Sequence, residues 1–392
     1  PGDTGTVRYV DWVTDFNTKS RGADAYVNGK FEGLGIQQEV VLGANYSKLT
    51  TDDQWARAAT AGADIFNIDH NRPQRDKYQL FQAGNASKSW YDIRQKGIYG
   101  TWRVKILDPL TLIVGARTSW YDYSYIDQSG SRGVYGSPSG SSTQTSGKVT
   151  PYAGLVYALN DQWSAYASYA DAFEPQTNLT TSGSLLKPIE GKNYELGLKG
   201  ELADGRLNTS FAIFRYDQEN RGVQDLQGPM NCGGWYCSVA SGKVRSQGFE
   251  ATLGGEVLPG LQLVSSYTYN TTKFLKDDTY EGKVFSTWTP KHLLKVWGDY
   301  QLPGDWNKVS VGAGVTAQSS TVAYDRTFSV PGNALWDSRV AYKINQEFTV
   351  AANLYNLFDK KYYIPAYNAN WGSNYYGDPR NVMFTMTYTP QF

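Results

Sequence analysis

Apolar and polar residues alternate along most of this chain with a period of two. In one segment, Tyr194, Leu196 and Leu198 fall on one face, and Glu195 and Lys199 fall on the other. This is the period of a β-strand that has two different surroundings, because successive side chains point to opposite faces. About sixteen segments follow the pattern, which predicts an all-β protein.

The connections between these segments alternate between short and long. A soluble sandwich has no reason to lengthen every second connection, whereas a transmembrane barrel has short periplasmic turns and long outer loops. Loops longer than about 12–15 residues are uncommon unless they carry function. The sequence therefore predicts a transmembrane antiparallel β-barrel with a functional loop end. The expected turns are at 32–35, 108–110, 160–162, 203–205, 258–260, 303–305 and 345–347, and the expected loops are at 50–88, 127–146, 173–190, 220–243, 273–290, 320–332 and 359–379.

The two faces of the predicted strands differ in chemistry. The apolar face has no other element to cover it, so lipid is its simplest partner. Trp120, Trp163 and Trp336 fall on this face near strand ends, as an interfacial aromatic girdle requires. The opposite face is too charged for a dry core and must line water or contact a polar plug. Its charged residues are Arg117, Glu195, Lys199, Glu250, Lys295, Asp299, Asp337 and Arg339.

Composition narrows the function. The chain has 37 Lys and Arg residues and 37 Asp and Glu residues, so its formal net charge of zero does not suggest a nucleic-acid partner. No phosphate loop, nucleophile elbow or pair of catalytic carboxylates occurs in a plausible setting, and we expect no enzyme. His70 and His292 are the two histidines, and solvated side chains are a better interpretation of them than iron ligands.

Cys232 and Cys237 are the two cysteines, and they lie close together in the loop expected at 220–243. A disulfide that closes a small external loop in an oxidising compartment is the favoured interpretation. A metal site is the weaker alternative, because no histidine lies nearby and two thiolates alone bind metal poorly.

Seven segments together resemble the C-terminal part of the TonB-dependent siderophore receptors of the outer membrane of Gram-negative bacteria. They follow the order of the family and cover nearly the whole chain. The nearest resemblance is to the ferric-hydroxamate branch, which includes receptors for coprogen, rhodotorulic acid and ferrioxamine, with the pyoverdine receptors close by. The segments are LIVGAR at 112–117, AYASYADAFEPQ at 165–176, GKNYELGLK at 191–199, GKVRSQGFE at 242–250, TWTPKH at 287–292, NLFDKKYY at 356–363 and GDPR at 377–380, ahead of the terminal Phe392.

The resemblance implies a 22-stranded barrel that is closed by an N-terminal plug. Residues 1–392 would then be part of the barrel domain, with the plug and the first strands lying outside this sequence. The implied function is binding of a ferric siderophore followed by import that the TonB–ExbB–ExbD complex energises through the missing N-terminal part. A monomer is implied, surrounded by outer-membrane lipid and lipopolysaccharide, and phages or bacteriocins are possible further partners.

Such a receptor needs no cofactor and no metal ligands of its own, because the iron arrives chelated by the siderophore. It needs a concave surface that stacks on flat chelate faces and makes a few polar contacts. Tyr121 and Tyr123 share the inward parity of Arg117, and Tyr91 does so if its strand has no bulge. For each aromatic residue, a place in the girdle or in loop packing is the alternative. The candidate binding residues are Trp90, Tyr91, Arg117, Tyr121, Tyr123, Tyr324, Trp371 and Tyr375.

Two other functions compete with siderophore import. A passive porin is the main alternative, because porins of 16–18 strands leave an open channel. An outer-membrane hydrolase would need a nucleophile or acid–base cluster, which the sequence does not present. Among siderophores, the loops favour a neutral or weakly charged hydroxamate or mixed chelate, because they carry many aromatic and few basic residues, whereas a strongly anionic catecholate would favour a dense basic funnel.

Overall fold

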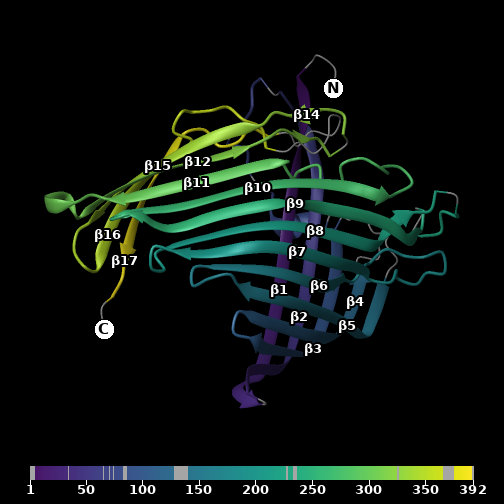
Figure 1. The fold of residues 1–392 in the computed structure, drawn as a ribbon. Helices are drawn as coiled ribbons and strands as arrows, with labels where there is room; N and C mark the ends of the chain where they lie inside the picture. The colour runs from purple at the N-terminus through teal and green to yellow at the C-terminus, as the bar shows by residue number, and fades with distance from the viewer. Residues whose placement is uncertain are drawn as a thin grey trace.

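The computed structural model describes residues 5–33, 35–64, 66–69, 71–73, 75–82, 86–127, 140–226, 228–232, 236–324, 326–364 and 375–390. Fifteen strands form one antiparallel sheet whose order follows the chain, from β1 at one end to β17 at the other. Figure 1 shows that this sheet curves strongly, so that the early and the late strands run in different directions. A separate two-stranded hairpin, β13–β14, interrupts the order between β12 and β15.

Short elements accompany the long strands. The helix α1 and the 3₁₀ turn η1 are brief, and no helix in the described ranges is long and apolar enough to cross a membrane. The elements are β1 (Thr6–Gly33), β2 (Ile36–Asp64), α1 (Lys77–Gln82), β3 (Ala86–Leu107), β4 (Leu110–Asp127), β5 (Gly140–Ala158), β6 (Trp163–Glu174), β7 (Ile189–Leu202), β8 (Leu207–Gln224), β9 (Ser238–Leu258), β10 (Leu261–Lys276), β11 (His292–Gln301), η1 (Gly304–Trp306), β12 (Val309–Gln318), β13 (Thr321–Val322), β14 (Ser329–Val330), β15 (Asn333–Lys343), β16 (Phe348–Tyr355) and β17 (Asn381–Tyr388).

The seven short turns lie where the sequence predicts them, but several strands are longer than expected. The loop expected at 50–88 starts later, since β2 continues to Asp64 and pairs with β1 along nearly its whole length. The segment from 50 to 64 is rich in Ala, Asp and Thr and has little β-propensity of its own. Its pairing with β1 and β3 stabilises it as a strand, an interaction that local sequence does not reveal.

Strand register confirms the two predicted faces. Residues that pair across strands share a face, and Trp297 pairs with Gly314, which pairs with Asp337. A Cβ atom at Gly314 would lie 2.6 Å from the Trp297 ring, so the ring lies flat against β12 at this point. We call the face that carries Trp297, Asp299 and Asp337 the polar face.

The opposite face, which we call the apolar face, exposes large hydrophobic side chains. Leu196 is 54% exposed, Ile213 is 58% exposed and Val340 is 53% exposed, although each lies in the middle of a strand. By register, Trp163 and Trp336 also lie on this face. Hydrophobic residues that face outward along the strands are what a lipid-facing wall requires.

A candidate ligand-binding surface at the loop end of the sheet

Four tyrosines gather on the polar face where β3 and β4 approach the long loops. Tyr91 pairs directly with Tyr125, and their ring centroids are 4.9 Å apart. Tyr123 follows on the same face, with its ring centroid 6.4 Å from that of Tyr91. Tyr121 continues the row by strand parity. We call Tyr91, Tyr121, Tyr123 and Tyr125 the tyrosine cluster. Three of its members are candidates from the sequence.

Tyr91 faces inward because β3 and β4 pair without a bulge from Ser89 to Lys105. The condition that the sequence left open is therefore met for Tyr91. Tyr125 belongs to the aromatic residues that the sequence places at the outer ends of the strands, but it is not one of the eight candidate binding residues. The register adds it because it lies opposite Tyr91.

Arg117 lies on the same face, closer to the turn end of β4. Its Nε donates to Ser119 Oγ at 2.9 Å, and its Nη2 donates to Asn45 Oδ1 on β2 at 2.9 Å. The guanidinium reaches β2 by crossing Gly97, where a Cβ atom would lie 2.1 Å from Nη2. These contacts hold Arg117 as a fixed positive charge below the tyrosine cluster.

Trp90 lies on the opposite face from Tyr91. Its pairing partners are Asp52 on β2 and Ile126 on β4, both of which have the outward parity of Trp120. The structure therefore does not bring Trp90 to the tyrosine cluster, even though the two residues are adjacent in sequence.

The remaining aromatic candidates lie in loops. Tyr324, which is 53% exposed, lies in the turn between β13 and β14, and Tyr375, which is 63% exposed, lies in the segment before β17. Trp371 lies outside the described residues. The contacts in the described ranges do not join Tyr324 or Tyr375 to the tyrosine cluster.

The loops also contain cation–π and ring contacts that the sequence did not indicate. The Arg326 guanidinium lies 4.2 Å from the Tyr280 ring centroid and 5.8 Å from that of Phe274, and its Nη2 donates to the Val284 carbonyl. Tyr363 and Tyr376 have ring centroids 4.8 Å apart. The hydrogen bond from the Tyr363 hydroxyl to that of Tyr376 raises the pKa of Tyr363. These contacts position aromatic rings at the loop end.

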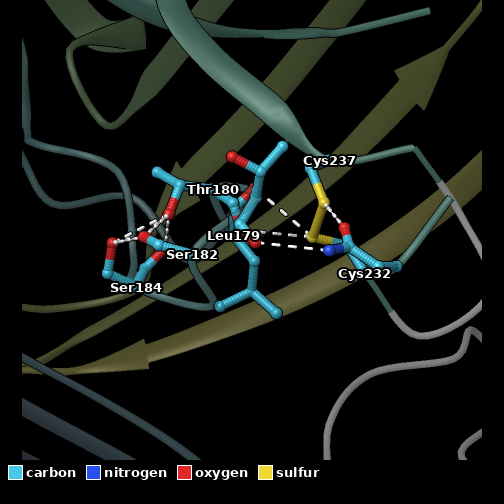
Figure 2. Close-up of a disulfide and its surroundings, with 8 residues drawn as sticks. Leu179, Thr180, Ser182, Ser184, Cys232 and Cys237 are labelled. Atoms are coloured by element: carbon cyan, nitrogen blue, oxygen red, sulfur yellow. Dashed lines mark hydrogen bonds between the residues drawn. A yellow bond between two sulfur atoms is a disulfide. The ribbon is translucent and has the colours of Figure 1, made fainter. Parts of the chain in front are cut away.

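Two neighbouring loops, 175–188 and 225–237, contact each other around a disulfide. We call the contacts of Leu179 and Thr180 with Cys232 and Ser238 the loop clamp. A disulfide joins Cys232 to Cys237, and the Cys232 sulfur lies 3.4 Å from the Thr180 carbonyl oxygen of the other loop (Figure 2). Just past Cys237, the Ser238 amide donates to the Leu179 carbonyl at 2.8 Å. The two loops therefore form one unit at the loop end of the sheet.

Gln176 makes further contacts next to the loop clamp. Its side chain is buried, and its Nε2 donates to the carbonyls of Lys187 and Asn220, while its Oε1 accepts from the Gly222 amide. One amide side chain thus joins the loop 175–188 to the loop end of β8. The sequence offered no signal for this role, since it depends on how the loop packs against the strand.

Other features of the described residues do not indicate a catalytic or metal centre. A hollow of about 700 Å³ lies at the turn end of the sheet, next to Trp163, Lys199 and Glu201, far along the strands from the tyrosine cluster. No group of three or more His, Cys, Asp or Glu residues within the described ranges could hold a metal ion.

Comparison with known proteins identifies the family of this chain. The protein-family model described as TonB dependent receptor-like, beta-barrel matches residues 2–357. The ferric-pyoverdine M114 receptor PbuA of Pseudomonas sp. strain M114 is 42% identical over 386 residues, which are 95% of this chain and 46% of that protein. The chain belongs to the TonB-dependent receptors.

Solved structures agree with this assignment. The crystal structure of the ferripyoverdine receptor of the Pseudomonas aeruginosa outer membrane bound to ferripyoverdine superposes with a TM-score of 0.81 at 32% identity, covering 99% of this chain and 50% of that one. The structure of the FpvAI–pyocin S2 complex superposes with a TM-score of 0.83 at 33% identity, covering 99% of this chain and 51% of that one. The chain thus spans about half the length of these relatives, and its strands form the wall of a Gram-negative outer-membrane barrel from a family of transporters rather than enzymes.

Proposed function

We propose that residues 1–392 form part of the barrel wall of a receptor. This receptor imports a ferric siderophore of the pyoverdine type. The observation that carries the proposal is the alignment of nearly the whole chain with receptors named for ferric pyoverdine. A plug and the connection to the TonB–ExbB–ExbD complex would come from the rest of the receptor.

The relatives change the expected siderophore. The sequence pattern favoured a hydroxamate such as coprogen or ferrioxamine, whereas the similar receptors are named for pyoverdine. The physical expectation for the surface is unchanged, because aromatic rings and few charges suit a chelate that binds mainly by stacking. The hydroxamates therefore become the competing ligands in the test.

The tyrosine cluster is the proposed contact surface on this part of the wall. Its rings offer flat apolar faces, and its hydroxyls can donate or accept hydrogen bonds. Arg117 lies below the cluster, where its fixed charge favours polar or anionic groups of a ligand that enters the mouth. Because the iron is carried by the siderophore, the protein supplies no metal ligand.

Two further points bear on partners. One similar structure is a complex with pyocin S2, which supports the proposal that the loop end of this receptor is also open to a bacteriocin. The passive porin is the remaining alternative, and it predicts diffusion without a saturable ligand site or any need for energy coupling.

The test uses the full-length receptor that contains this chain. Binding of ferric pyoverdine, ferric coprogen and ferrioxamine is measured by titration, and uptake of radioactive iron is measured in cells with and without TonB. We expect tight, saturable binding of a ferric pyoverdine and uptake that requires TonB. Tighter binding of either hydroxamate would overturn the choice of ligand, and uptake that does not need TonB would support the porin.

An adjacent pair of residues tests the site separately. Tyr91→Ala should weaken ferric-pyoverdine binding by about 1 kcal/mol or more, the scale of an aromatic contact. Trp90→Ala is the matched control, because Trp90 lies on the opposite face and should leave binding unchanged. If Tyr91→Ala, Tyr123→Ala and Tyr125→Ala all bind normally, these rings are structural while the import function stands.

A further inference from the structure

The loop between β10 and β11, residues 277–291, folds back on the end of its own strand. Phe274, near the loop end of β10, contacts Phe285 edge-on with the ring centroids 5.2 Å apart, and its centroid lies 5.8 Å from that of Tyr280. The Phe274 amide also donates to the Lys283 carbonyl at 3.0 Å. These rings give the loop an aromatic centre of its own. We call Phe274, Tyr280 and Phe285 the loop core.

Two arginines from other parts of the sheet pack on the loop core. The Arg221 guanidinium, near the loop end of β8, lies 4.7 Å from the Phe285 ring centroid. The Arg326 guanidinium, in the turn of the β13–β14 hairpin, lies 4.2 Å from the Tyr280 ring centroid. A cation over an aromatic ring is attracted by the ring quadrupole, and the attraction grows as water is excluded. In sheet order, β8 and β12 lie on opposite sides of β10 and β11, so the two arginines link the loop core to its neighbours on both sides.

The β13–β14 hairpin is joined to the β10–β11 loop by backbone contacts as well. Arg326 Nη2 donates to the Val284 carbonyl, and Nη1 donates to the Tyr324 carbonyl of the hairpin itself, each at 3.1 Å. The Val322 amide donates to the Thr287 carbonyl at 3.2 Å. The loop and the hairpin therefore order together, because carbonyls of the loop satisfy donors of the hairpin.

The backbone around Arg221 is held by a side chain from the β6–β7 loop. Gln176 accepts from the Gly222 amide and donates to the Asn220 carbonyl, and these two residues flank Arg221. Asn220 has a left-handed backbone, with φ of 62°, where β8 departs from regular pairing with β9. Within the described ranges, the Arg221 guanidinium makes one hydrogen bond, from Nη1 to Gln218 Oε1 at 2.8 Å, and no ion pair. The cation is thus placed against the loop core without a carboxylate to neutralise it.

These contacts form one path across the loop end of the polar face. Phe274 pairs with Val244 of β9, which pairs with Gln218 of β8. Val244 has the parity of Glu250 on β9, one of the residues that the sequence assigns to the polar face. The path therefore lies on the face that also carries the tyrosine cluster. It runs from the β6–β7 loop through Arg221 and the loop core to the β13–β14 hairpin, and only the fold brings these segments together.

We propose that Arg221 is a positioning residue that couples the β6–β7 loop, the β10–β11 loop and the β13–β14 hairpin, so that the three order and move as one body. Energetic coupling travels through packed contacts that have two discrete arrangements. The stack of Arg221 on Phe285 supplies two such states, because the guanidinium has no ion pair within the described residues that must break when the stack opens. A molecule that holds one of these segments in place would thereby hold the others. The coupling concerns the loops alone and does not depend on which siderophore is imported.

Hydrogen exchange of the full-length receptor without ligand tests the coupling. Arg221→Gln should speed exchange of the hydrogen-bonded amides at 282–285 and, through the loop core, of those at 321–330, with which Arg221 makes no described contact. We expect roughly threefold faster exchange in both segments, from the loss of one cation–π contact. Faster exchange at 282–285 alone would overturn the coupling, because Arg221 would then be a local packing residue. Unchanged exchange in both segments would overturn it as well.

A double-mutant cycle with Arg326→Gln gives a second measurement. If the two arginines act on one body, exchange at 282–285 in the combined variant should be slower than the product of the two single effects predicts. Independent, multiplicative effects would contradict the coupling.

Two controls complete the design. Arg215→Gln removes a cation from the apolar face of the same strand, where Arg215 pairs with Asp217, and should leave exchange in both segments unchanged. Arg221→Lys keeps a cation near Phe285 and should keep the hairpin amides close to native exchange. If Arg215→Gln acts like Arg221→Gln, the effect is one of net charge or general stability and the coupling is refuted. Exchange in Arg221→Lys as fast as in Arg221→Gln would refute the role of the cation. Iron uptake enters none of these measurements, so a failure here leaves the proposed function standing, and the reverse also holds.

Discussion

Tyr91 and Tyr194 have similar local surroundings but lie on opposite faces of the sheet. Each lies toward the loop end of a long strand and packs against a second tyrosine, at centroid distances of 4.9 Å and 5.2 Å. Tyr91 lies on the polar face, above Arg117, whereas Tyr194 lies on the apolar face, above Leu196. The residue type and the pair geometry are the same for Tyr91, the proposed ligand contact, and for Tyr194. Only the face of the sheet distinguishes the two residues.

The two faces also hold large rings differently. On the polar face, Trp297 lies flat across Gly314 of the next strand, which keeps the lumen side of the wall thin. On the apolar face, the Trp336 side chain is 44% exposed, and its ring contacts that of Phe358 edge-on with the centroids 6.4 Å apart. Lipid can cover an exposed ring, whereas the plug or ligand proposed for the lumen would favour rings that lie against the wall.

The largest expected effect follows from a charge placed on the wrong face. Val296→Arg introduces a cation on the apolar face of β11 and should reduce the free energy of folding into bilayers by roughly 2–4 kcal/mol. Asp299→Asn on the polar face of the same strand should cost about 1 kcal/mol or less, since it weakens a half-exposed ion pair with Arg339. Urea unfolding in lipid vesicles measures both, and equal losses would refute the assignment of faces.

A smaller effect sharpens the comparison between the two tyrosines. Tyr194→Ala should lower stability in vesicles by about 1 kcal/mol, through loss of the ring contact with Tyr169 and of the interfacial anchor. It should leave ferric-siderophore affinity unchanged, in contrast to Tyr91→Ala. A Tyr194→Ala receptor that binds siderophore poorly would mean that the ring acts beyond its own face.

The smallest effect on the barrel is expected at the loop clamp, which belongs to neither face. Replacing Cys232 and Cys237 with serine should change the free energy of unfolding of the barrel by less than about 1 kcal/mol, because the loops can open while the sheet stays intact. Hydrogen exchange at Leu179–Ser184 should nevertheless become faster. Unchanged exchange there would show that Gln176 and the backbone contacts hold the loops without the disulfide.

Much of the wall could be predicted from local pattern. Alternation identified the two faces, and the tight turns between 32 and 347 were all placed correctly. The loop boundaries were less accurate, because β2 extends to Asp64 through residues of low β-propensity. The long loops also contained contacts without a sequence signal, such as those of Arg326 with two aromatic rings and those of Gln176 with its own loop and β8.

The sequence by itself determined the class of this protein, because side chains alternate with a period of two in every strand and that period is set by the backbone. It also determined which residues of a strand share a face. Only the tertiary structure decided which residues of different strands meet, since register depends on pairing between distant segments. Register is why Tyr125 joins Tyr91 and why Trp90 lies apart from both.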